Sequence, residues 1–90
     1  MLSERKIAKD DNFDKYYKVL PAHIKRKFEK QVRILLKNPK HPSLKIHRFE
    51  SIKNLWEFYV DDYYRCLFSM EGNIYSLKWV GTHPQMEKKG

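Results

Sequence analysis

The chain has little of what several common classes of protein need. Its 90 residues contain one cysteine, Cys66, so neither an internal disulfide nor a thiolate metal site is expected. No apolar run approaches the roughly 20 residues that cross a bilayer, and the charged start MLSERKIAKDDNF has no hydrophobic region for export. We therefore expect a cytoplasmic protein in which Cys66 is a buried structural thiol.

Motifs of metal-dependent and nucleotide-dependent enzymes are also missing. There is no glycine-rich phosphate loop, no GxSxG or HExxH sequence, and no carboxylate cluster that would hold magnesium. We therefore expect no metal and no cofactor, and metal-dependent hydrolysis is disfavoured.

What the chain has in excess is positive charge. Lysine and arginine number 19 against 11 acidic residues, a net charge of +8. Such a surface attracts polyanions and speeds encounter with nucleic acid, but a solvated basic surface or an acidic protein partner would explain it equally well. Hydrophobic residues make up 41% of the chain, which is enough for a packed core, so we expect residues 1–90 to form one globular domain.

Two helices are predicted in the first half of the chain. The segment DDNFDKYYKVL has helical spacing after an Asp/Asn cluster suited to an N-cap. The stronger signal follows Pro21, where Ile24, Phe28, Val32 and Leu35 recur along one face of a helix that NPKHP ends. The opposite face of this second helix is rich in lysine and arginine, and His23 on it is interpreted as a plain surface residue.

From residue 44 the pattern changes to β-branched and aromatic runs separated by turn residues: LKIHRFE, NLWEFYV, YYRCLFSM and IYSLKWV. Short connections of this kind predict antiparallel hairpins, with a weaker initial strand near Arg5 to Ala8. The expected fold class is α+β, with two N-terminal helices packed on a curved three- to four-stranded antiparallel sheet. Alternation sends Cys66 and Phe68 toward the helices and leaves Arg65 and Tyr59 on an open face.

Imidazoles and cations are what remain for chemistry: His41, Lys45, His47, Arg48, Arg65, Lys78 and His83. RNA can be cleaved without a metal because its own 2′-hydroxyl can attack, given a base, an acid and cations for the developing charge. Histidine suits the first two tasks and arginine the third. The two histidines act together only if the fold brings them together, and Arg65 and Lys45 could equally be solvated strand residues.

The segment LKIHRFESIKNLWEFYVDDYYRCLFSM and the ending GNIYSLKWVGTH resemble the RelE/ParE superfamily of toxins from toxin–antitoxin pairs, and within it the RelE- and YafQ-like ribonucleases. The resemblance covers roughly residues 5 to 83 and implies that helices pack on a curved sheet whose concave face acts. It leaves three functions open. Ribonuclease members cut mRNA in the ribosomal A site, the ParE branch inhibits DNA gyrase, and a silent relative would only bind its antitoxin.

The resemblance assigns roles to particular residues. His83, in VGTH, falls where the YafQ-like enzymes have a C-terminal catalytic histidine, and His47, in KIHRFES, matches another of their histidines. Arg65 matches the arginine that RelE-type enzymes place on the phosphate-binding strand. The chain departs from both patterns: LWEFYV lacks the lysines of RelE, and Tyr59 and Tyr63 stand where YafQ has a histidine and an aspartate. Since tyrosine is a poor general base near neutral pH, the catalytic set is incomplete.

We therefore expect a toxin that cleaves mRNA, on the ribosome, through 2′-hydroxyl attack and so inhibits translation. The expected catalytic residues are His83, His47 and Arg65, with the acid and base roles of the histidines open, and the expected phosphate or RNA contacts are Lys45, Arg48, Tyr59 and Lys78. The expected partners are a cognate antitoxin, mRNA and the ribosome with its 16S rRNA, and no membrane. A short tail after His83 should leave the concave face open to RNA.

Overall fold

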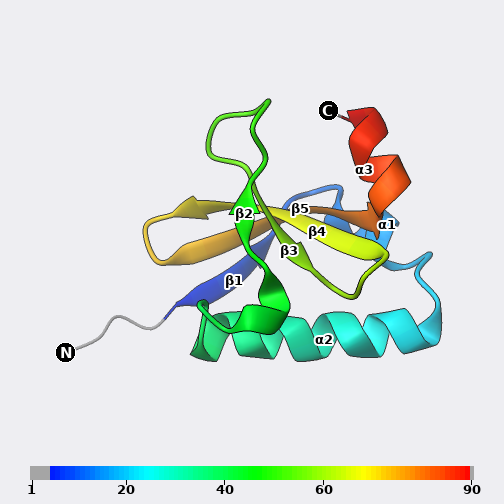
Figure 1. Cartoon of the computed structure of the whole chain (residues 1–90), viewed down its shortest axis with the longest axis horizontal. Helices are drawn as coiled ribbons and strands as arrows, with labels where there is room; N and C mark the ends of the chain where they lie inside the picture. Colours follow the sequence, from blue (N-terminus) through cyan, green and yellow to red (C-terminus); the bar gives the residue numbers. More distant parts are fainter. Residues whose placement is uncertain (1–4, 90) are drawn as a thin grey trace.

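The computed structural model describes residues 5–89 as an α+β fold (Figure 1). The elements follow in the order β1 (Lys6–Lys9), α1 (Phe13–Tyr17), α2 (Ala22–Lys37), the short 3₁₀ helix η1 (Pro42–Leu44), β2 (His47–Arg48), β3 (Trp56–Tyr59), β4 (Tyr64–Glu71), β5 (Ile74–Thr82) and α3 (His83–Lys89). In Figure 1, α2 lies along one face of the sheet, whereas α3 and the loop between β2 and β3 rise from the opposite side. We call these two sides the α2 face and the second face.

The five strands lie in the order β1-β5-β4-β3-β2. The three hairpins from β2 to β5 are antiparallel, as predicted, and left-handed backbone at Asn54 and Gly72 turns two of the connections. The weakly predicted initial strand is present as β1, but it pairs in parallel with β5. The sheet therefore has one more strand than expected and is not wholly antiparallel. A parallel pair is possible here because β1 and β5 are separated in sequence by all the other elements from α1 to β4, whereas a hairpin would make them antiparallel.

Helix α2 has the predicted amphipathic face. Ile24, Phe28 and Leu35 are buried against Phe58, Cys66 and Phe68 of the sheet. The sequence pattern predicts Pro21 as the first helical residue, whereas the structure has it as the N-cap, one position earlier. Cys66 is fully buried, which confirms the prediction of a structural thiol, and this burial raises the pKa of the thiol well above its ordinary value.

Gln31 replaces one predicted core residue of α2. Val32 is only half-buried, whereas the side chain of Gln31 is buried and its Nε2 donates a hydrogen bond of 2.8 Å to the backbone oxygen of Tyr59. A buried amide is tolerated here because this oxygen accepts its hydrogen bond. The contact ties α2 directly to the end of β3.

A bulge in β5 decides which side chains reach the second face. Leu67 lies opposite Trp79 and Phe68 lies opposite Leu77, so Lys78 has no residue opposite it on β4. As a result Leu77 and Val80 join the core on the α2 face, while Trp79 packs with Leu67 on the second face. Strict alternation would put Leu77 and Trp79 on the same face of β5, but the bulge between them puts their side chains on opposite faces.

Helix α3 corrects the expectation of an open second face. Thr82 and Gln85 form a reciprocal N-terminal cap: the Thr82 N–H donates to Gln85 Oε1 at 2.9 Å, and the Gln85 N–H donates to Thr82 Oγ1 at 3.3 Å. The helix begins at His83, and its Met86 packs against Leu67 and Trp79. The segment after His83 therefore covers part of the face that we expected it to leave bare.

Candidate functional site

The part of the second face that α3 leaves uncovered carries a polar cluster built around a buried carboxylate. We call it the Glu57 cluster: Lys45, His47, Glu57, Tyr59 and Arg65. Its strand members are aligned by register, since His47 lies opposite Glu57 and Tyr59 lies opposite Arg65. Neighbouring strands and period-two alternation thus bring together four of the seven site residues predicted from the sequence.

Arg65 is held from several sides. Its Nε lies 3.2 Å from Glu57 Oε2 in an ion pair that is not aligned as a hydrogen bond. Its Nη1 donates to the backbone oxygens of Asp61 and Asp62, at 3.2 and 2.6 Å. The guanidinium carbon lies 3.7 Å from the centre of the Tyr59 ring, a cation–π contact. With 6% of its surface exposed, Arg65 is a fixed charge, and among the described residues its buried Nε has an ion-pair partner but no hydrogen-bond partner.

His47 is bound through both of its ring nitrogens. Nε2 is in direct contact with Glu57 Oε1, and Nδ1 lies 2.9 Å from the backbone oxygen of Lys45. Lys45 adopts a left-handed conformation with φ of 47°, at the turn that joins η1 to β2. The Lys45 ammonium lies 5.0 Å from the centre of the Tyr59 ring, and the His47 ring meets that ring edge-on at 6.4 Å. About half of the His47 side chain is exposed, so it is the accessible member of a partly buried network.

The other predicted site residues lie away from this cluster. Arg48 is exposed and lines a small pocket of about 290 Å³ with Glu50. Lys78, at the bulge of β5, pairs with Asp10 at 3.6 Å. His41 has a local structural role, because its Nδ1 accepts a hydrogen bond from the Ser43 N–H and caps η1.

His83 stands at the junction of β5 and α3. Its N–H donates to the backbone oxygen of Tyr63, and its Nε2 lies 3.7 Å from Glu87 Oε2 with both side chains exposed. Strands β2 and β5 are three strand spacings apart, about 14 Å across the sheet, with Arg65 on β4 between them. The structure therefore places His83 beyond direct contact with His47.

Glu57 is the residue that the sequence reasoning missed. It lies in the segment LWEFYV, which departs from the RelE pattern, yet only 3% of its surface is exposed and it contacts both His47 and Arg65. A signal was available, because alternation already places Glu57 on the same face as Tyr59 and Arg65. A lone carboxylate among cations on one sheet face predicts an ion pair, since a buried charge needs a partner.

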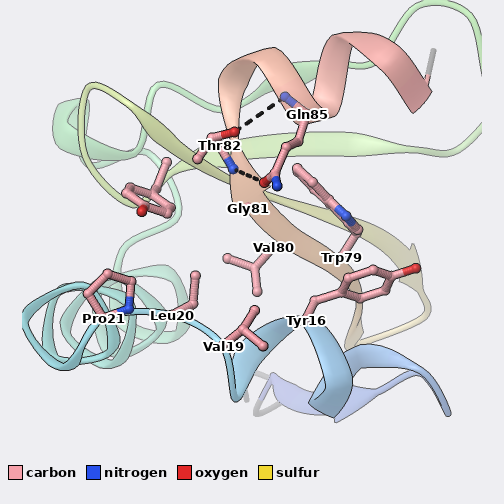
Figure 2. A pocket seen from close by; sticks show the side chains of 10 residues that line it. Tyr16, Val19, Leu20, Pro21, Trp79, Val80, Gly81, Thr82 and Gln85 are labelled. Carbon is pink, nitrogen blue, oxygen red and sulfur yellow. Dashed lines mark hydrogen bonds between the residues drawn. The ribbon is translucent and has the colours of Figure 1, made fainter.

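A second feature is a pocket of about 330 Å³ beside β5, between the α1–α2 turn and α3 (Figure 2). Val19, exposed over 74% of its surface, lies on the α1–α2 turn at this pocket, and the Thr82–Gln85 cap lies at the α3 end. A Cβ on Gly81 would lie 2.5 Å from Trp79 Cζ2 and 2.7 Å from Gln85 Oε1. The full lining is Tyr16, Val19, Leu20, Pro21, Tyr64, Trp79, Val80, Gly81, Thr82 and Gln85.

Among residues 5–89, no group of three or more histidine, cysteine, aspartate or glutamate side chains is placed to hold a metal ion. No helix in this part of the chain is both long enough and apolar enough to span a bilayer.

The fold is that of solved toxin structures, although no family model and no curated protein matches the sequence. YafQ from E. coli aligns with a TM-score of 0.75 over 91% of this chain and 97% of its own, at 20% identity. The RelB–RelE antitoxin–toxin complex from Methanococcus jannaschii aligns at 0.74 over 91% of this chain and 96% of that one, with 14% identity. The YoeB/ParE toxin from Agrobacterium tumefaciens aligns at 0.72 over 87% and 98%, with 13% identity. These alignments confirm the predicted RelE-like fold over nearly the whole chain.

Proposed function

We propose that this chain, whose fold is that of the RelE and YafQ toxins, is the toxin of a toxin–antitoxin pair and an endoribonuclease that cuts ribosome-bound mRNA without a metal ion. Fold alone does not define function, since one fold hosts many activities. The proposal therefore depends on the site that this fold carries.

The observation that carries it is the set of imidazole and cationic groups on the second face. His47 and Lys45 are exposed, Arg65 provides a fixed charge beside them, and both cations contact the Tyr59 ring. His83 is the first residue of α3, the helix that rises from the second face of the sheet (Figure 1). A protein that only bound gyrase would have no need of two histidines there.

The proposed reaction uses chemistry that these residues can supply. One histidine removes the proton of the 2′-hydroxyl, the 2′-oxygen attacks the adjacent phosphorus, and the other histidine protonates the departing 5′-oxygen. Lys45 and Arg65 stabilise the charge that develops on the reacting phosphate, and Arg48, which lies outside the Glu57 cluster, contacts a neighbouring phosphate. Tyr59 is suited to stack on a base, because one face of an aromatic ring accepts any base. The products are a 2′,3′-cyclic phosphate and a 5′-hydroxyl.

The outer face of α2 supports a role for large anionic partners. Lys30, Arg33 and Lys37 are exposed there and line a pocket of about 360 Å³ that also contains Ile34. Phosphate contacts of this kind hold a protein on RNA without reading its sequence. We propose 16S rRNA as the ribosomal contact and a cognate antitoxin as the protein partner, as the RelB–RelE complex is an antitoxin–toxin pair.

Primer extension on an mRNA translated with and without the protein tests the proposal. We expect cuts within the coding region of the translated message and none in a message whose start codon has been removed. His83→Ala should abolish the cuts, and His23→Ala is the matched control, because His23 is an exposed histidine on α2. Intact message with accumulating DNA breaks would instead establish the gyrase-inhibiting alternative, and intact message without breaks would leave an antitoxin-binding relative.

A further inference from the structure

The outer side of α2 carries a groove between the last turns of the helix and the chain that follows it. The groove has a volume of about 360 Å³ and is lined by Lys30, Arg33, Ile34, Lys37, Asn38 and His41. We call it the α2 groove. Its three cations recur every three or four residues, so they lie along one side of the helix with Ile34 among them. The α2 groove shares no residue with the Glu57 cluster, which lies on the second face of the sheet.

The three cations of the α2 groove are not neutralised by the rest of the protein. Among the described residues, none of Lys30, Arg33 and Lys37 forms a salt bridge. The only acidic residue of α2 is Glu29, whose Oε2 accepts a hydrogen bond of 2.7 Å from the Tyr17 hydroxyl. All three cations are exposed, and like charges at this spacing on a helix repel one another. A negatively charged ligand would therefore relieve a repulsion that the folded chain carries.

Ile34 distinguishes the α2 groove from a plain basic surface. It is half-buried and packs against the main core, and the stems of the neighbouring lysines add apolar surface around it. Polar groups at the far side are already engaged: Asn38 Oδ1 accepts from the Lys40 N–H at 3.3 Å, and His41 Nδ1 accepts from the Ser43 N–H at 3.1 Å. A phosphate would bind the cations but gain nothing from covering Ile34, whereas an apolar side chain flanked by carboxylates would use both features.

We propose that the α2 groove is the docking site for an acidic segment of the partner protein. The segment inserts one large apolar side chain beside Ile34 and places carboxylates against Lys30, Arg33 and Lys37. The inference rests on the proposed toxin–antitoxin pairing and names a surface that the antitoxin uses. Because the same cations are proposed to contact rRNA, the acidic segment and RNA exclude each other. This contact takes the protein off the ribosome independently of any contact with the Glu57 cluster.

Two synthetic peptides test the apolar contact on the wild-type protein. Both consist of Glu and Asp residues around one central residue, which is Leu in the first peptide and Ser in the second, so their charges are equal. We expect the Leu peptide to bind about tenfold more tightly, because it buries apolar surface that Ser lacks. Fluorescence anisotropy of the labelled peptides at physiological salt gives both dissociation constants. Equal affinities would overturn the proposal, since charge alone would then account for binding.

Variants of the protein locate the bound peptide. Ile34→Ser should remove the preference for the Leu peptide and leave the affinity for an RNA hairpin unchanged. Arg33→Gln should weaken the binding of both ligands, because both need the cation. Ile52→Ser is the matched control, because Ile52 is an exposed isoleucine of the loop between β2 and β3, and it should change neither affinity. Equal losses of peptide and RNA affinity in an Ile34→Ser protein that keeps its helical circular dichroism would make the groove a nucleic-acid site and overturn the proposal. The comparison of the two peptides on the wild type depends on no variant.

Competition tests the exclusion of RNA. Excess Leu peptide should displace a labelled RNA hairpin from the wild-type protein, and simultaneous binding of the two would overturn the proposal. A wild-type dimer that becomes a monomer in Ile34→Ser would also overturn it, because a second copy would then fill the groove. None of these measurements needs cleavage, so they are separate from the proposed ribonuclease function. A protein that prefers the Leu peptide but leaves mRNA intact loses only that function, and one that cuts mRNA but binds both peptides equally loses only the docking site.

Discussion

Asp61, in the turn between β3 and β4, shows how a single side chain fixes the geometry beside the Glu57 cluster. Its Oδ1 accepts hydrogen bonds from the N–H groups of Tyr63 and Tyr64 at 2.9 and 2.8 Å, and its Oδ2 lies 3.3 Å from Lys27 Nζ. Its backbone oxygen accepts from Arg65. The same residue therefore closes the turn, joins it to α2 and helps to hold the guanidinium in place.

This environment predicts a pH-dependent stability. Burial raises the pKa of Asp61, but the hydrogen bonds from Tyr64 and Tyr63 and the contact with Lys27 outweigh it and leave the pKa below its ordinary 3.8. A carboxyl whose pKa is lowered by folding stabilises the protein above its unfolded pKa, and loses this contribution as the pH falls through the folded pKa. We expect Asp61→Asn to lower the free energy of unfolding by about 1 kcal/mol at neutral pH. In urea titrations the difference should shrink as the pH falls below 3.8; a constant difference would contradict the assignment.

Gly81 is required by packing and not by backbone conformation. Its missing Cβ leaves room for the Trp79 ring, which would otherwise lie 2.5 Å away. We expect Gly81→Ala to cost about 1–3 kcal/mol, as overpacking usually does, and to shift the tryptophan fluorescence. Gly72→Ala is the control: it has open space around its Cβ but a φ of +62°, so it should lose stability without disturbing Trp79. A Gly81→Ala protein as stable as the wild type would mean that the Trp79 ring can move away from the added methyl group without loss of stability.

At the scale of elements, the helices and strands that the sequence predicted best are those with a strong hydrophobic periodicity. Helix α2 has apolar positions over four turns; its start lies one residue from the predicted one, and it ends at Lys37, directly before NPKHP as predicted. The strand predicted over LKIHRFE is shorter in the structure and includes only His47 and Arg48, because Pro42 starts a 3₁₀ helix and Lys45 has a positive φ. A short 3₁₀ helix and a single left-handed residue produce no repeating hydrophobic pattern, so the sequence pattern does not reveal them.

The remaining differences come from contacts that are distant in sequence. The parallel pairing of β1 with β5 joins residues 6–9 to residues 74–77, and no local pattern specifies a partner so far along the chain. The bulge at Lys78 likewise depends on β4 opposite. The candidate site was predictable in part, since alternation gathered Tyr59 and Arg65 on one face, but the role of Glu57 required seeing both of its partners.

Helix α3, by contrast, could have been predicted. The sequence Thr82-His83-Pro84-Gln85 has the spacing of a capping box, with threonine at the N-cap and glutamine three residues later. It was overlooked because the segment is short and polar. The box matters to the site because it sets where β5 ends and hence where His83 stands.

The capping box can be tested directly. We expect Gln85→Ala to remove the acceptor of the Thr82 N–H and to cost about 1 kcal/mol, which is typical of a lost N-terminal cap. Gln85→Glu keeps an acceptor at the same place and should retain most of that stability. Amide hydrogen exchange in α3 is the measurement, with β4 amides as the internal reference. Equal protection of α3 in all three proteins would show that Met86 packing alone holds the helix.

At the scale of the whole molecule, small size and high charge act together. A domain of this length buries only about 60 to 65% of the surface that its unfolded chain exposes, so its core contributes a narrow margin of stability. The net charge of +8 adds self-repulsion in the folded state. An acidic partner would relieve both at once, because it covers apolar surface and neutralises charge. This gives the proposed antitoxin a thermodynamic role beyond blocking the site.

This role has a measurable size. A ligand that binds only the folded state at 100 times its Kd adds about 2.7 kcal/mol to stability. For a domain of this size each kcal/mol raises Tm by about 4–8 °C, so we expect the acidic product of an adjacent gene to raise Tm by about 10–20 °C. High salt should reduce the shift, because it screens the charge attraction.

A peptide of equal negative charge and scrambled sequence is the control, and it should give a smaller shift that salt abolishes. Equal shifts from both would mean that the +8 surface binds any polyanion; no shift from the adjacent gene product would remove it as the antitoxin.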